Sequence, residues 1–249
     1  EPDMFKSYNF RVKLQAEIKP WLTIASNTKF FQSNYKYYGY EDEYNNFRKP
    51  TLHALASFVP VNPDGTAVSH TSVTNSSTHY LMDGYSAMMQ KGKSFGNKKT
   101  QEITTTFEAT FKLHKNFNVK ADFSYTQGYL HNDYRSVNVQ YSQYPGEVKT
   151  LSSGSRFEDK LYEKTMMHNY YQANIYGTFN RTFAQDHNFK AMVGFNWETK
   201  FLKDVSATGY NLLSETLMDL NLIGQDADGD KRMEVGGGQN EYALMGFFG

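Results

Sequence analysis

The most regular feature of the chain is a strict alternation of apolar and polar residues over long segments. In residues 8–18 the even positions are apolar or aromatic and the odd positions are charged or amide-bearing. Because successive side chains of a β-strand point to opposite faces, this period of two predicts strands with one apolar and one polar face. The same pattern recurs in residues 103–113, 117–125, 171–179 and 189–197, and more weakly in 22–30.

These segments predict an all-β protein with a single antiparallel sheet. Together with a strand-like run at residues 242–248, they give about seven strands, each paired with the next along the chain. The expected strands cover residues 4–18, 21–37, 101–113, 117–129, 165–182, 188–202 and 241–249.

The connections between the expected strands alternate between short and long. Lys19-Pro20, residues 114–116 and residues 184–187 are short, whereas residues 39–99, 131–163 and 204–240 are long. Antiparallel pairing puts all the long connections at one end, as in outer-membrane barrels with tight periplasmic turns and long extracellular loops. The strands are also long enough to cross a bilayer. A soluble antiparallel sheet with one wet face produces the same alternation and remains the alternative.

Composition narrows the possible classes of protein. Twenty-six basic residues balance 26 acidic ones, so the chain lacks the positive surplus of a nucleic-acid-binding protein. It has no cysteine, which excludes disulfides, thiol nucleophiles and Cys-ligated metals. The mean hydropathy is −0.67, and no apolar run is long enough for a membrane-spanning helix. The 19 Phe and 19 Tyr residues include pairs that bracket the apolar faces, such as Phe117 with Tyr125 and Phe189 with Trp197, as interfacial girdles do.

The two ends of the sequence lead us to expect a piece of a longer polypeptide. Residue 1 is Glu rather than Met, no signal-like segment follows it, and the chain stops inside the expected strand 242–248. Known transmembrane barrels have at least eight strands, so we expect residues 1–249 to be part of one barrel domain whose other strands lie elsewhere.

The residues that could carry metal or phosphate chemistry do not form complete motifs. The seven histidines are not spaced as metal ligands; they are His53, His70, His79, His114, His131, His168 and His187. His168 falls in the polar phase of its strand, and His114 and His187 fall at short turns. Asp226, Asp228 and Asp230 resemble the start of a calcium loop, but Lys231 and Gly237 replace its required Gly and Glu. We therefore expect a solvated acidic turn there, continued by a flexible loop at residues 236–238.

No catalytic motif is present either. Gly92-Lys93-Ser94 resembles the end of a phosphate-binding loop, but Ala87 stands where its first Gly is required. No G-x-S-x-G elbow occurs, although a Ser-His-Asp triad can be assembled from residues distant in sequence. We predict no enzyme activity, no cofactor and no metal site.

The first long connection is rich in tyrosine and charge, with Tyr35, Tyr37, Tyr38, Tyr40 and Tyr44 close to Glu41, Asp42, Glu43 and Arg48. Aromatic faces beside hydrogen-bonding groups suit sugar or peptide ligands. The alternative is that these tyrosines belong to the outer girdle, so no ligand-binding residue is assigned.

Three segments resemble the SusC/RagA-type TonB-dependent outer-membrane transporters. They are residues 187–198 (HNFKAMVGFNWE), 58–65 (FVPVNPDG) and 241–249 (EYALMGFFG), and the strand-turn-strand region 9–22 is similar to that family as well. The sequence departs from the family pattern at Gly246, where a small polar residue is expected, and it ends before the usual Arg and Tyr.

The resemblance implies the middle of a barrel of about 22 strands in the bacterial outer membrane, with a plug domain and a TonB-contacting segment outside this chain. It further implies import of oligosaccharides or peptides together with a SusD-like surface lipoprotein. A passive porin or structural barrel would share every strand argument, and a soluble carbohydrate-binding β domain or a barrel enzyme are further alternatives.

Overall fold

The computed structural model describes residues 3–38, 61–65, 67–68, 94–137, 140–142, 146, 148–150, 159–184 and 187–249. Its long strands are β1 (Met4–Lys19), β2 (Leu22–Tyr38), β4 (Phe95–His114), β5 (Phe117–Ser136), β8 (Lys160–Phe183), β9 (His187–Tyr210) and β10 (Met233–Phe248). Three short strands are β3 (Ala67–Val68), β6 (Gln140–Ser142) and β7 (Val148–Thr150). The helix in the described part of the chain is the 3-10 turn η1 (Leu220–Leu222), so no described helix could span a membrane.

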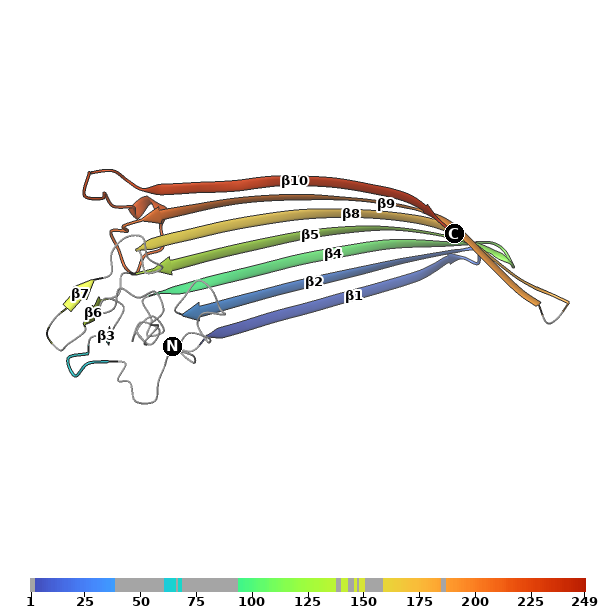
Figure 1. Cartoon of the computed structure of the whole chain (residues 1–249). Helices are drawn as coiled ribbons and strands as arrows, with labels where there is room; N and C mark the ends of the chain where they lie inside the picture. The colour runs from blue at the N-terminus through green and yellow to red at the C-terminus, as the bar shows by residue number, and fades with distance from the viewer. Residues whose placement is uncertain are drawn as a thin grey trace.

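The long strands form one seven-stranded antiparallel sheet in the order β1-β2-β4-β5-β8-β9-β10. Each strand pairs with the next long strand of the sequence, as predicted, and the sheet is open with β1 and β10 at its edges (Figure 1). The connections 39–94, 137–159 and 211–232 all leave from one end of the sheet, called here the loop end. The short turns 20–21, 115–116 and 184–186 mark the opposite turn end.

The strand register brings the apolar phases of all the strands onto one face. Ser26 pairs with Phe107, Phe107 with Phe123, Phe123 with Ala173, and Ala173 with Trp197. The opposite phases align in the same way, in rows such as Glu108, Asp122, Asn174 and Asn196. The sheet therefore has a continuous apolar face and a continuous polar face, as the alternation predicts.

The strands extend further toward the loop end than the alternation predicted. β4 begins at Phe95 rather than at residue 101, β5 continues to Ser136, and β8 and β9 reach Lys160 and Tyr210. The predicted flexible loop at residues 236–238 is wrong, because these glycines lie within β10 and pair with residues 204–206 of β9. Backbone hydrogen bonds to a neighbouring strand hold these segments extended without an alternating pattern.

The buried side chains gather at the loop end of the sheet. They include Tyr37, Tyr134, Leu161, Tyr210 and Ile223, all at or beyond the loop ends of the long strands. In contrast, the apolar face is open along its length, with Phe10, Leu14, Phe107, Ile175 and Val193 among its exposed residues. An uncovered apolar surface of this extent marks a contact with membrane or protein.

Candidate functional site

The polar face carries a row of hydrogen-bonded side chains that crosses three neighbouring strands. The amide of Asn196 donates to the Asn174 side-chain oxygen at 2.7 Å, and the amide of Asn174 donates to the Asp122 carboxylate at 2.8 Å. These residues occupy one register row of β9, β8 and β5. The Asn174 amide thus donates to one neighbour and accepts from the other, which fixes the orientation of its side chain.

Further polar pairs surround this row. The Lys120 amine lies 2.6 Å from the Glu108 carboxylate, and the Tyr170 hydroxyl donates to the Glu198 carboxylate at 2.5 Å. Threonine and serine hydroxyls also pair across β4 and β5, with Thr106 and Ser124 2.7 Å apart. These side chains are half-exposed, so the polar face is a wall that can exchange hydrogen bonds with water or a polar solute.

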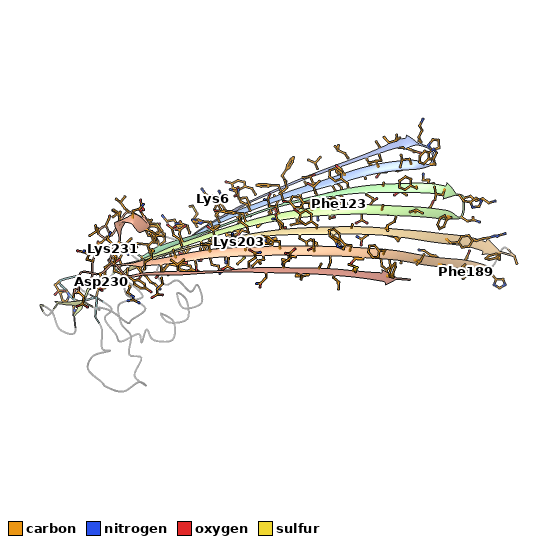
Figure 2. The ribbon with its side chains drawn as sticks, turned by 90° about the horizontal axis from the view of Figure 1, so that it is seen from above. Lys6, Phe123, Phe189, Lys203, Asp230 and Lys231 are labelled. Carbon is orange, nitrogen blue, oxygen red and sulfur yellow. The ribbon has the colours of Figure 1, made fainter. Side chains whose placement is uncertain are left out.

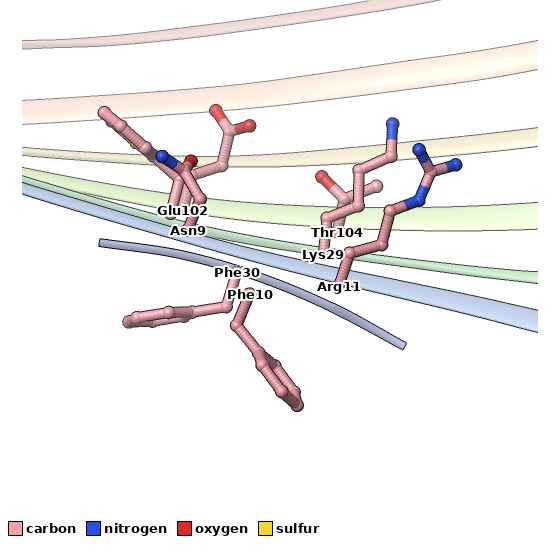
Figure 3. A pocket seen from close by; sticks show the side chains of 8 residues that line it. Asn9, Phe10, Arg11, Lys29, Phe30, Glu102 and Thr104 are labelled. Atoms are coloured by element: carbon pink, nitrogen blue, oxygen red, sulfur yellow. The ribbon is translucent and has the colours of Figure 1, made fainter. Parts of the chain in front are cut away.

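The two faces are distinct at the β1 edge, where Figure 3 shows a hollow in the sheet surface. Arg11 and Lys29 are directly opposite each other in the register and rise on the same side as Glu102. Phe10 and Phe30 point to the other side. Two cations and a carboxylate thus lie on the polar face of this region, while the rings of Phe10 and Phe30 lie on the apolar face.

Aromatic rings stack where the polar face meets the loop end. The rings of Tyr35 and Tyr37 have centroids 5.3 Å apart, and Tyr37 stacks on Tyr134 at 6.3 Å with an interplanar angle of 9°. The register places Gly96 between Tyr37 and Tyr134. A Cβ at Gly96 would overlap the Tyr37 ring, so the absence of a side chain lets the two rings meet across β4.

Arg135, which follows Tyr134 near the end of β5, joins three segments at the loop end. One terminal nitrogen of its fully buried guanidinium lies 2.5 Å from the Asp159 carboxylate and also donates to the carbonyls of Ser136 and Lys160. The other terminal nitrogen donates to the carbonyl of Ser214 at 3.0 Å. A planar guanidinium can satisfy several acceptors at once, so it ties the end of β5, the start of β8 and residues 211–232 together.

Residues 211–232, the long connection between β9 and β10, are held together by contacts of their own. Leu212 bridges to Ile223, and both side chains are buried. The Gly224 amide donates to the Asn211 carbonyl at 2.7 Å. Leu213 and Leu217 remain exposed, so this connection presents apolar side chains to the surroundings at the loop end.

Of the candidate tyrosines, the structure describes Tyr35, Tyr37 and Tyr38. Tyr37 and Tyr38 are 2% and 5% exposed, and Tyr35 contributes to the aromatic stack. Tyr37 and Tyr38 are therefore packing residues of the loop end rather than open ligand contacts. Tyr40, Tyr44, Glu41, Asp42, Glu43 and Arg48 lie outside the described residues, as do Ala87, Gly92 and Lys93.

The described histidines make local contacts. His168 lies on the polar face as predicted, with its Nε2 3.8 Å from a Glu102 oxygen. His114 Nδ1 accepts the backbone amide of Asn116 at 3.3 Å and so supports the β4–β5 turn. His53, His70 and His79 lie outside the described residues. Within the described ranges, no three His, Asp or Glu side chains come together in a way that could hold a metal ion.

The acidic segment near residue 228 is a turn, as predicted. The Asp226 carboxylate accepts the backbone amides of Asp228 and Asp230 at 3.0 and 2.9 Å. Figure 2 shows Asp230 at the loop end, far from Phe189 at the turn end. One oxygen of the Asp226 carboxylate therefore closes the turn by accepting two backbone amides.

Sequence reasoning missed the buried cluster around Arg135. Its partners are separated from it by up to 79 residues, and a single Arg in a polar stretch carries no distinguishing pattern. The extension of β5 and β8 to residues 136 and 160 is what brings Arg135 and Asp159 together.

Comparison with known proteins identifies the fold. No family model and no curated protein matches the chain. Solved structures do match: the RagAB peptide transporter at a TM-score of 0.70 with 14% identity over 99% of this chain, and the RagAB peptide importer in its open-open and closed-closed states at 0.70 and 0.68, each with 14% identity over 98% of this chain. The chain spans 25–26% of the length of those chains. Its seven antiparallel strands thus have the fold of part of the RagAB barrel.

Proposed function

We propose that this chain is a segment of the barrel wall of a SusC/RagA-type importer in the bacterial outer membrane. The observation that carries the proposal is the match of nearly the whole chain to about a quarter of the RagAB chains. The two-faced sheet supports it independently. An open apolar face opposite a hydrogen-bonded polar face is what a barrel wall between lipid and an aqueous interior requires.

The proposal assigns a surrounding to each part of the sheet. The apolar face, with Phe107, Ile175 and Val193, contacts lipid, and the polar face with the Asp122–Asn174–Asn196 row lines the interior. The short turns face the periplasm and the loop end faces outward. The exposed edges of β1 and β10 pair with further strands of the same protein, because an unpaired edge within lipid would leave backbone groups without hydrogen bonds.

The solute is an oligosaccharide or a peptide. The polar face offers amide, hydroxyl, carboxylate and ammonium groups in alternation, which can exchange hydrogen bonds with sugar hydroxyls or peptide groups. The similarity to RagAB, described as a peptide transporter, favours import over passive diffusion and favours a peptide among the two solutes. Transport, rather than catalysis, is the activity we assign to the chain.

The proposed import needs parts beyond this chain. A barrel large enough for such solutes has to be closed by a plug, which in this class moves when TonB transmits energy from the inner membrane. A SusD-like surface lipoprotein would sit over the loop end, as the two-component RagAB complex supports. The exposed Leu213 and Leu217 and the aromatic stack all lie at the loop end, which such a partner would cover.

Uptake in whole cells tests this proposal. Cells that express the full-length protein should take up labelled peptides or oligosaccharides when TonB and the proton gradient are intact, and should lose this uptake when either is removed. An otherwise identical strain lacking the protein gives the background. Undiminished uptake without TonB would reject the importer and support a passive porin, and hydrolysis of the solute by the purified protein would support an enzyme.

A further inference from the structure

The hairpin of β8 and β9 carries an unusual combination of side chains at the turn end. Residues 180–183 and 187–190 continue the two strands beyond the level of the β4–β5 turn, where the Asn180 amide donates to the Asn116 carbonyl. The side chains of Thr182 and Asn188 hydrogen-bond at 2.6 Å across the hairpin. The strands are therefore still paired in this extension, and the register fixes which side chains share a face.

The face that continues the apolar face holds aromatic and cationic residues together. Arg181 pairs with Phe189, and Phe183 pairs with His187. Phe179 lies on the same face, two residues before Arg181 in β8, and its ring centroid is 6.3 Å from that of Phe189. Phe183 and Phe189 are 42% and 53% exposed, so neither ring is covered by the described protein.

Arg181 is positioned by a ring rather than by an acid. Its guanidinium carbon lies 4.7 Å from the centroid of Phe183, and it makes no ion pair or hydrogen bond with another described residue. The cation–π contact holds the guanidinium beside the apolar ring while its donors remain available. Asp186, in the turn, lies outside the described residues.

The strand tilt of a barrel places this group at a definite depth. The strands of a barrel are tilted relative to its axis, so residues that pair in the register lie at different membrane depths on successive strands. The three turns of this sheet advance in the same direction, from 20–21 through 115–116 to 184–186. In the register Phe111 is level with Gly177 and Val193, so Phe189 and Phe183 lie four and six residues further toward the turn end, in the direction in which the turns advance.

We propose that the tip of the β8–β9 hairpin binds the headgroups of anionic phospholipids in the inner leaflet of the outer membrane. The proposal rests on the membrane assignment made above. Phe183 and Phe189 lie at the boundary of the acyl chains, where aromatic rings are favoured. Arg181 binds the lipid phosphate, since a guanidinium matches phosphate oxygens in geometry and charge. The proposed ligand is a phospholipid because Arg181 lies between Phe179 and Phe183 on the face of β8 that continues the lipid-facing surface of the sheet.

Spin labels measure where the hairpin lies. In a cysteine-free background of the full-length protein, single nitroxides replace Phe183, Lys190 or Val193 in bilayers of phosphatidylcholine and phosphatidylglycerol. Lys190 serves as the matched control because it pairs with Asn180 on the opposite face of the same hairpin. We expect the labels at 183 and 193 to be accessible to oxygen and shielded from a water-soluble nickel complex, and the label at 190 to show the reverse.

Lipid retention measures the headgroup contact. Native mass spectrometry of protein released from the same bilayers counts bound phosphatidylglycerol against phosphatidylcholine. Arg181→Gln should lower the preference for phosphatidylglycerol about fivefold, the effect of one cation near an anionic surface, whereas Lys190→Gln should leave it unchanged. Equal preferences in the wild type and Arg181→Gln would overturn the headgroup site.

The labels also separate this inference from the proposed function. A label at 193 in lipid with a label at 183 in water would reject the hairpin contact and leave the barrel assignment standing. A label at 193 in water would reject the membrane assignment itself, and with it the hairpin contact.

Discussion

Substitution of Val193 by lysine tests the assignment of the two faces most directly. Val193 is 65% exposed on the apolar face of β9, between Phe189 and Trp197, which we place near the two borders of the lipid-facing band. Its register partner is Gly177, which has no side chain that could shield a charge. A lysine near the middle of the lipid-facing band of a barrel costs about 2–4 kcal/mol, so Val193→Lys should lower the free energy of unfolding by about that amount.

Asn196→Lys is the matched control on the opposite face of the same strand. Asn196 is three positions from Val193, but its side chain belongs to the polar row and donates to Asn174 at 2.7 Å. Its replacement removes this hydrogen bond, which contributes about 1 kcal/mol, and the new ammonium group stays in water. The two substitutions add the same charge at nearly the same depth, so the difference between their effects reports the surroundings of each face.

Equilibrium unfolding in guanidinium chloride measures both effects on the full-length protein in bilayers. The transition of Val193→Lys should shift to clearly lower denaturant than that of Asn196→Lys. Equal destabilisation, or a larger effect of Asn196→Lys, would mean that the apolar face does not contact lipid.

Three further predictions concern the loop end. Arg135→Ala should leave the Asp159 carboxylate without its cation and lower the local free energy of unfolding at the ends of β5 and β8 by about 3–5 kcal/mol. This loss is measured as faster hydrogen exchange there, and unchanged exchange would contradict the stabilising role of Arg135. Gly224→Ala would place a Cβ 2.5 Å from a backbone carbonyl oxygen and should cost about 1–3 kcal/mol, whereas Gly246→Ala has no atom within 4 Å and should be nearly neutral by the same measurement. Deletion of residues 40–93 leaves β2 and β4 intact, so the barrel should still insert and resist unfolding by detergent while capture of solute or partner is lost; undiminished capture would place recognition elsewhere.

The local pattern of the sequence was enough to predict the strands and their faces. Alternation in residues 103–113, 117–125 and 189–197 depends only on the geometry of a single strand, in which side chains alternate. Short turns such as Lys115-Asn116 fix which strands are neighbours and bring their apolar phases to the same side. For this reason the order of the seven-stranded sheet and the position of His168 on the polar face were both predictable.

The interactions between distant segments were decided by the tertiary structure. Residues 236–238 are glycines without side chains to alternate, and only their pairing with β9 makes them a strand. The burial of Tyr37 depends on Tyr134, and the role of Arg135 depends on Asp159 and Ser214. These contacts arise because β2, β5 and β8 extend past the alternating segments and converge at the loop end.

The sequence by itself therefore determined the strands, their order and the division into an apolar and a polar face. The tertiary structure alone decided how far the strands continue, which side chains are buried at the loop end and which cations lie beside aromatic rings at the turn end. The physical reason is that side-chain alternation is a property of one strand, whereas register, burial and ion pairing require groups from several strands to meet in space.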